Sequence, residues 1–262
     1  ALPHTEGCGN STGSEAMYAR TMVGYIIHPM VKHCLLLEHG CEKTHNDFMR
    51  RQMEEMGIDY DRIGFASIQL DGGIDKVSQK VEAWFAGQLS AASPAEKVSA
   101  GLEALRIGIV SDGPIPDEAA AQLAGLTQMV VGAGGTVVVP ENSGLLTASA
   151  YTGKLLSGAA VSPSIAYGEH ARLNGFHVME TPTEHWVETI TGLAATGVEL
   201  IIALVHQRPM QSHPFVPMLQ IAANPAMQAY AEDLDLCLSG TPHDWISQIL
   251  ERSKQVLEHA YT

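Results

Sequence analysis

The chain has 262 residues, of which 45% are hydrophobic and 17% charged, and its 15 basic and 29 acidic side chains give a formal net charge of −14. This length and composition indicate one large globular domain or two smaller ones, and they exclude disordered and collagen-like chains. The negative charge argues against nucleic acids and anionic membrane surfaces as partners, because both require a basic patch.

The first residues and the cysteines indicate where such a chain works. No apolar run approaches the roughly 18 residues of a membrane span, and the start at Ala1 lacks the basic and apolar stretches of a secretory leader. Four cysteines in a chain this long do not make a disulfide framework. We therefore expect a cytoplasmic protein. The sequence does not begin with Met, which leaves room for residues upstream.

Strand-like and helix-like segments alternate along the chain. Short β-rich runs predict strands at residues 34–38, 63–70, 107–111, 136–139, 176–179 and 200–205. Amphipathic runs predict helices at residues 14–27, 45–56, 74–88, 116–132, 183–195, 225–231 and 243–261. Several strands are continuously apolar, as in sheets buried on both faces. The pattern predicts an α/β fold with a mainly parallel sheet flanked by helices, in which ligands bind beyond the carboxyl ends of the strands.

One linker divides this pattern. Residues 90–95 (SAASPA) are small and polar and include a proline. They predict a smaller α/β unit at residues 1–95 and a larger α/β domain at residues 96–262, although a break within one continuous domain fits the same residues. Residues 140–165 are rich in Gly, Ala and Ser with weak periodicity, which suits a mobile cover or an interface.

Two polar clusters carry groups that could do chemistry. Residues 4–13 place His4, a glutamate and Cys8 among glycines that let the backbone approach a ligand, although they also suit a glycine-rich turn with Ser and Thr caps. Residues 38–47 follow the strand CLLLE and include Cys41, Glu42 and His45, a dense set of metal ligands or acid–base groups. The alternative for the second cluster is a polar loop in which Thr44 or Asn46 caps the next helix. Its position at a strand end favours a site.

Two further strand ends carry polar groups. Arg208 follows the strand LIIALV and is one of few cations in an acidic chain, so it could pair with a carboxylate, of a ligand or of a nearby acid. Ser111 and Asp112 follow the strand IGIVS, where they suit a ligand loop or, more simply, a turn into the next helix.

At these clusters the sequence resembles the altronate/galactarate dehydratase family of sugar-acid dehydratases. The resemblance follows the family's order across nearly the whole chain. It rests on short stretches at residues 4–42, 65–84, 134–141, 175–182, 223–225 and 233–236. The motifs include Gly-Cys-Gly, His-Pro, Gly-Cys-Glu, a Gly-Gly-Thr-Val strand and a Thr-Pro segment, here preceded by Glu180 where the family has Asp.

The resemblance implies a metal-dependent hydro-lyase, a Rossmann-like parallel sheet and a preceding dimerisation region, hence a homodimer. It also implies a divalent metal, foremost Fe²⁺ with Mn²⁺ or Mg²⁺ as alternatives, and a small anionic sugar acid as substrate. The family's small β-rich N-terminal domain is absent from this chain, so a separate domain or subunit would supply it. Related members act instead as sulfo-lyases and remove sulfite from sulfolactate.

Several family positions differ. The Cys-Gly-Gly-Ser-Asp that follows the family's strand reads Val110-Ser111-Asp112-Gly113 here, the Gly-Arg-Gly-Ser loop is replaced by residues 206–209 (HQRP), and a downstream Lys is Gln220. A non-catalytic relative that acts as a ligand-binding or oligomerisation module is therefore the competing hypothesis.

Dehydration of a sugar acid removes the proton α to the carboxylate and expels the β-hydroxyl group. A divalent metal stabilises the charge that develops, a base takes the proton, and an acid protonates the leaving hydroxyl. We expect the catalytic and metal-binding residues among His4, Cys8, Cys41, Glu42 and His45. The substrate-binding residues are expected to be Arg208, Asn46, Ser111 and Asp112.

Overall fold

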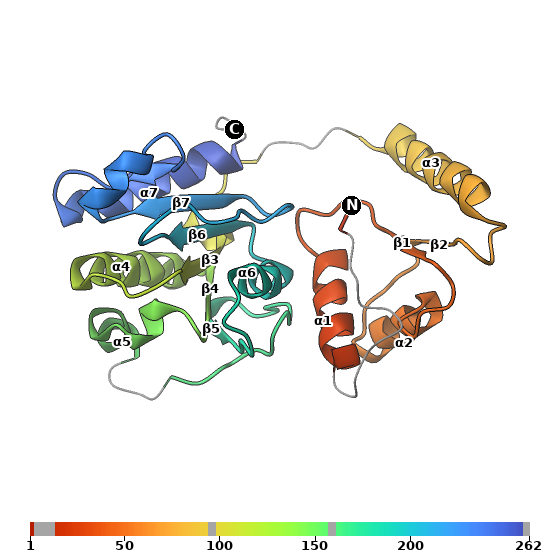
Figure 1. Ribbon diagram of the computed structural model, residues 1–262, viewed down its shortest axis with the longest axis horizontal. Helices are drawn as coiled ribbons and strands as arrows, with labels where there is room; N and C mark the ends of the chain where they lie inside the picture. Colours follow the sequence, from red (N-terminus) through yellow and green to blue (C-terminus); the bar gives the residue numbers. More distant parts are fainter. Residues whose placement is uncertain (3–13, 94–97, 157–160, 259–262) are drawn as a thin grey trace. The chain divides into compact units, whose positions relative to one another are not determined.

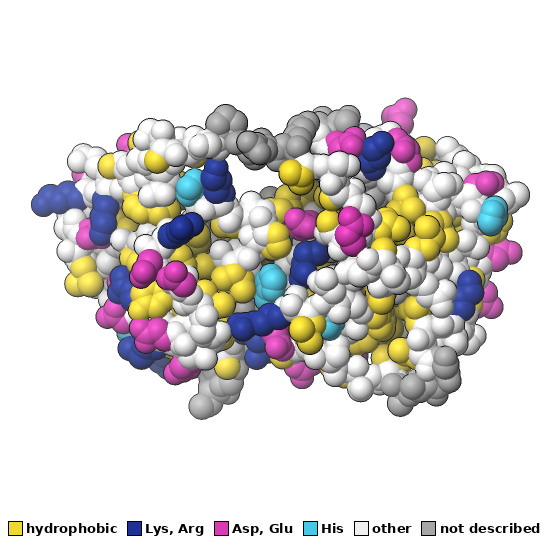
Figure 2. All heavy atoms as spheres, turned by 180° about the vertical axis from the view of Figure 1, so that it is seen from behind, with side chains coloured by type: hydrophobic (Ala, Val, Ile, Leu, Met, Phe, Trp, Pro, Cys, Tyr) yellow, Lys and Arg dark blue, Asp and Glu magenta, His cyan; other side chains and the backbone are white. Residues whose placement is uncertain are grey.

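The computed structural model describes residues 1–2, 14–93, 98–156 and 161–258, and the chain divides into two compact units, Ala1–Ser99 and Ala100–Thr262. The sequence predicts this boundary four residues earlier, between residues 95 and 96. Figure 2 shows acidic and basic side chains on the surface of both units. Within the described ranges, no helix has the length and apolar character needed to cross a bilayer.

The first unit is a small α/β layer. Its elements are α1 (Ser14–Ile26), β1 (Leu35–Glu38), α2 (Asn46–Glu55), β2 (Gly64–Ser67) and α3 (Ile74–Ala91). The two strands pair in parallel, so their carboxyl ends lie side by side (Figure 1). A cluster of apolar side chains from α1 and α2, with Val23 and Met53 at its centre, forms the core. The indole ring of Trp84, a residue of α3, lies against Gly64 of β2, where a Cβ atom would not fit.

The second unit is built on a six-stranded sheet. Its elements in chain order are η1 (Leu102–Ala104), β3 (Arg106–Ser111), α4 (Asp117–Ala133), β4 (Thr136–Pro140), η2 (Gly144–Thr147), α5 (Ser149–Leu156), β5 (Gly175–Met179), α6 (Trp186–Ala195), β6 (Leu200–Leu204), β7 (Met218–Ala222), η3 (Pro225–Tyr230), β8 (Leu236–Cys237) and α7 (Pro242–Leu257). The strand order is β5-β4-β3-β6-β7-β8, and every pairing is parallel. This is the order of a Rossmann sheet, so the predicted fold class is confirmed.

Helices cover both faces of this sheet. The apolar faces of α4, α5 and α7 share one core cluster with the strands, while α6 lies on the other side (Figure 1). On that side Gly108 of β3 brings the strand close to α6, because a Cβ atom there would stand 2.9 Å from the Leu193 side chain. The central strands β3 and β6 are buried almost throughout, which explains their continuously apolar sequences.

The structure corrects several predicted elements of the second unit. The weakly periodic segment contains α5, and β7 and β8 were not predicted. Residues 225–230 form a 3₁₀ helix rather than an α-helix, and the helix expected from Thr183 begins at Trp186. The missed strands are weak signals, because β7 (MLQIA) carries a central glutamine and β8 has two residues.

Candidate functional site

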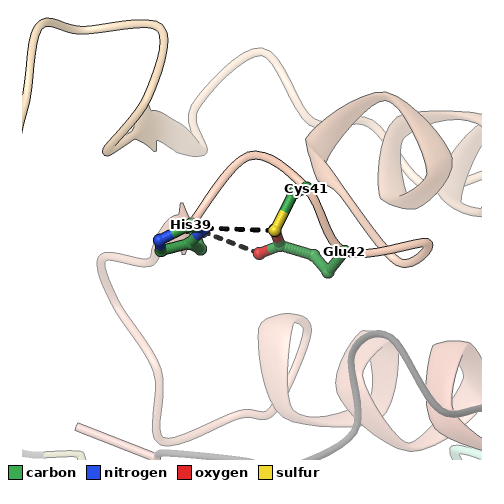
Figure 3. A group of neighbouring side chains, drawn as sticks. All are labelled: His39, Cys41 and Glu42. Atoms are coloured by element: carbon green, nitrogen blue, oxygen red, sulfur yellow. Dashed lines mark hydrogen bonds between the residues drawn. The ribbon is translucent and has the colours of Figure 1, made fainter.

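A loop at the carboxyl end of β1 gathers three metal-ligating side chains. His39, Cys41 and Glu42 offer a nitrogen, a sulfur and an oxygen atom that all lie within 4.8 Å of one another. Figure 3 shows the three side chains converging on one side of the loop. His39 and Cys41 are exposed and Glu42 is half-buried. Among the residues that the structure describes, no other group of three such ligands comes this close together. We refer to these three residues as the ligand loop.

The Glu42 carboxylate is held by the backbone of its own loop. Its Oε1 atom accepts a hydrogen bond from the His39 amide, and its Oε2 atom accepts one from the Gly40 amide, each at 2.7 Å. Burial raises the pKa of Glu42, but hydrogen bonds from the backbone amides of the loop outweigh it and hold the pKa below its ordinary value. The carboxylate is therefore ionised and oriented in the state that a cation requires.

Gly40 makes this conformation available. Its φ of +117° lies in the region that favours glycine, and a Cβ atom there would stand 2.9 Å from Gln69 Cβ and 3.1 Å from Ser67 Oγ. The loop is thus pressed against the carboxyl end of β2. The His39 ring also faces two neighbours, with its Nδ1 atom 3.3 Å from Cys41 Sγ and 3.5 Å from the Gln69 side-chain amide.

The other predicted residues of this region have structural contacts. The His45 ring accepts a hydrogen bond from the Phe48 amide at 3.2 Å, so His45, and neither Thr44 nor Asn46, caps α2. Asn46 is buried, its side-chain amide donates to the Ala66 carbonyl at 3.0 Å, and its backbone amide donates to Glu38.

The structure thus brings Cys41 and Glu42 together with His39 rather than with His45. His39 belongs to the predicted cluster, but no sequence signal selects it over His45. His4 and Cys8 lie outside the described residues.

In the second unit, Ser111 and Asp112 stand at the carboxyl end of β3. Ser111 Oγ accepts a hydrogen bond from the Gly144 amide at 3.0 Å, and Asp112 Oδ1 accepts one from the His206 amide at 2.8 Å. The second bond joins the ends of β3 and β6, where the strand order reverses and Rossmann sheets bind ligands. Burial raises the pKa of Asp112. Hydrogen bonds from the His206 and Asp112 backbone amides oppose that rise, and the nearby charges of His206 and Arg208 oppose it further.

A cavity of about 340 Å³ opens beside these residues. It lies within the range of small-ligand pockets, whose lower end is about 300 Å³. Loops after four neighbouring strands supply its walls. The lining residues are Val110, Ser111, Asp112, Gly113, Asn142, Gly144, Glu184, Trp186, Thr189 and Met210. Arg208, the predicted carboxylate partner, is exposed and is not among them.

Residues 1–92 match the sequence model of the second domain of D-galactarate dehydratase/altronate hydrolase. The resemblance seen in the sequence is confirmed over these residues. This second-domain match spans the ligand loop and ends within the first unit. No curated protein matches the chain at a significant level. The known similarity therefore belongs to the first unit, and the cavity of the second unit lies beyond the matched residues.

Proposed function

We propose that the chain is part of a hydro-lyase that dehydrates a sugar acid, and that the ligand loop holds its divalent metal. One observation carries the proposal: the convergent imidazole, thiol and carboxylate groups lie in the segment that is similar to a sugar-acid dehydratase domain. The matched family supports a lyase of this general class, and the metal and the elimination chemistry are our inference.

The donor set fits a transition metal better than a hard cation. Imidazole and thiolate ligands suit Fe²⁺ or Zn²⁺, whereas Mg²⁺ prefers a shell of oxygen atoms. The backbone amides that hold Glu42 fix the direction of one ligand before any ion arrives. Three protein ligands would also leave positions for substrate atoms, as catalytic metal sites require. We therefore favour Fe²⁺ over Mg²⁺.

The reaction needs two proton transfers. The α C–H bond breaks and its proton passes to a base, and the β C–O bond breaks as the hydroxyl takes a proton and leaves as water. A bound divalent cation would stabilise the negative charge that builds up on the substrate carboxylate. His45 would donate a hydrogen bond to the leaving hydroxyl, because its Nδ1 atom accepts a hydrogen bond from the Phe48 amide and its Nε2 atom then carries the proton.

Two further predicted residues lie in the matched segment. His4 and Cys8 would join the metal or the proton transfers. The sulfo-lyase alternative uses the same ligand loop on a sulfonated hydroxy acid, so a substrate panel has to include one.

Metal analysis of protein purified without oxygen tests the proposal. We expect the full chain to bind about one equivalent of Fe²⁺ or Co²⁺, with a thiolate-to-cobalt absorption band that Cys41→Ser abolishes. Cys237→Ser is the matched control, because Cys237 is a free cysteine of the second unit. The iron-loaded protein should convert a panel of hexarates and hexonates to α-keto acids, and His39→Ala should abolish turnover without unfolding the chain.

Two results would count against the proposal. Uptake that survives both Cys41→Ser and His39→Ala would remove the ligand loop from the metal site. Stoichiometric metal without turnover of any sugar acid or sulfonate, in the presence of the small β-rich partner domain, would favour the non-catalytic alternative instead.

A further inference from the structure

The cavity of the second unit is braced on several sides by hydrogen bonds. Ser111 joins the loops after β3 and β4, and Asp112 joins the ends of β3 and β6. The Asn142 side-chain amide donates to the Thr183 carbonyl at 2.8 Å and to Thr189 Oγ1 at 2.9 Å, which ties the loop after β4 to α6. These bonds hold the walls in place before a ligand arrives.

The parts of the wall formed by Trp186 and Met210 are also held by hydrogen bonds. The indole N–H of Trp186 donates to the Gln211 carbonyl at 2.8 Å, so the ring is anchored to the loop between β6 and β7. The buried side chain of Gln220 clamps Met210 on that loop, accepting from its amide at 2.6 Å and donating to its carbonyl at 2.9 Å. Gly113 and Gly144 meet so closely that a Cβ atom on Gly144 would collide with the Gly113 carbonyl.

The charged side chains that line the cavity are all acidic. It contains two carboxylates, on Asp112 and Glu184, and no lysine, arginine or histidine. An indole ring and a thioether supply apolar and polarisable surface, and Ser111, Asn142 and Thr189 supply neutral hydrogen-bonding groups. The charges of His206 and Arg208 act on Asp112 from outside the lining. An anionic ligand inside the cavity would therefore face both carboxylates without a lining cation to pair with. A cation would gain both carboxylates and the aromatic ring of Trp186.

We propose that this cavity binds a small hydroxylated organic cation, such as an amino sugar or an amino alcohol, and not a sugar acid. The ammonium group would pair with Asp112 and Glu184, and the hydroxyl groups would bond to the neutral polar side chains. The burial that raises the pKa of Asp112 is a cost of holding this carboxylate charged, and a bound cation offsets it. The net charge of −14 also attracts cations over long range.

Three ligands with the same sugar ring and different charges distinguish recognition of charge from recognition of shape. Titration calorimetry of the full chain at low salt, in a slightly acidic buffer, compares glucosamine, glucose and glucuronate. We expect glucosamine to bind about tenfold or more tightly than glucose, which corresponds to about 1.4 kcal/mol, and glucuronate to show no binding. Asp112→Asn should lower the affinity for glucosamine to that for glucose, because it keeps the acceptor oxygen for the His206 amide and removes the charge.

Control variants test whether the effect depends on this carboxylate and on an intact cavity. Glu232→Gln removes an exposed carboxylate outside the cavity lining and should leave all three affinities unchanged. Unchanged affinity for glucose in Asp112→Asn shows that the cavity is still formed, and Trp186→Leu should weaken both glucosamine and glucose. Equal affinities for the three ligands, no binding of glucosamine, or tightest binding of glucuronate would each overturn the inference. Metal uptake by the full chain depends on the ligand loop in the first unit, so the failure of one proposal leaves the other untouched.

Discussion

The backbone amide of His39 donates a hydrogen bond to the carboxylate of Glu42 at 2.7 Å, so one of the three residues of the ligand loop holds the side chain of a second in place. Gly40 stands between them and gives its own amide to the same carboxylate. The geometry of the donor set therefore depends on a backbone conformation and not on the three side chains alone.

We predict that Gly40→Ala destroys the ligand loop while leaving its ligands in the sequence. The left-handed φ costs about 1–2 kcal/mol for a residue with a Cβ atom, and that atom would also press on Gln69. The variant should lose Co²⁺ binding and unfold at lower denaturant concentration than the wild type.

Gly57→Ala provides the control for this change. Gly57 also has a positive φ, +69°, but no atom lies within 4 Å of the position of a Cβ atom. It should therefore share the backbone cost and keep full metal binding. Loss of metal binding in both variants, or in neither, would contradict the assigned role of Gly40.

Asp71 predicts a pH dependence in the first unit. Its carboxylate accepts hydrogen bonds from Lys80 and from the Ser67 amide at the end of β2, and these hold its pKa below the ordinary value. A lowered folded-state pKa contributes stability that is complete above the unfolded value and is lost as pH falls through the folded one. We therefore expect protection of the Ser67 amide from hydrogen exchange to fall in that acidic range.

Two variants isolate this contribution. Asp71→Asn should give the Ser67 amide lower protection at neutral pH and remove most of the acid-side change. Glu82→Gln, which neutralises an exposed acid on α3, should behave as the wild type does. The assignment fails if Asp71→Asn keeps the wild-type pH profile.

Much of the architecture could be predicted from the strands alone. The apolar runs of β3 and β6 indicate strands buried on both faces, and burial on both faces implies a parallel sheet covered by helices. The ligand loop follows β1, and Ser111 and Asp112 stand at the end of β3, because the sequences of both strands are unambiguous. Their roles as site residues stay predictions.

The choice of ligand within the loop could not be predicted in the same way. His39 lies two residues before Cys41 and His45 four residues after it, so spacing does not separate them. The structure does, because the chain turns at Gly40 with a positive φ and His39 contacts Cys41, while His45 caps α2. The cavity of the second unit was missed for a related reason. Trp186 and Glu184 fall in the first turn of the helix that the sequence predicts from residue 183, whereas α6 begins only at Trp186.

Gly108→Ala tests the close packing of β3 on α6. The new methyl group would stand 2.9 Å from the branched end of Leu193, and overpacking of a core of this kind costs about 1–3 kcal/mol. We expect a matching loss in the free energy of unfolding by urea. Adding Leu193→Val should recover part of that loss, so that the two changes together cost less than their sum; simple additivity would argue against the contact.

Gln220→Leu tests the clamp on the loop between β6 and β7. The change leaves the Met210 amide and carbonyl without the partners that Gln220 supplies, and a buried polar group that loses its partner costs about 1–3 kcal/mol. The variant should show lower unfolding free energy and faster hydrogen exchange at Met210. Gln220→Lys, which restores the residue type of the resembled family, should behave similarly because an ammonium group cannot accept from the Met210 amide. Gln248 makes the same paired contact with Ser239 on the exposed surface, so Gln248→Leu should cost much less. Equal costs at the two positions would show that burial does not set the strength of the clamp.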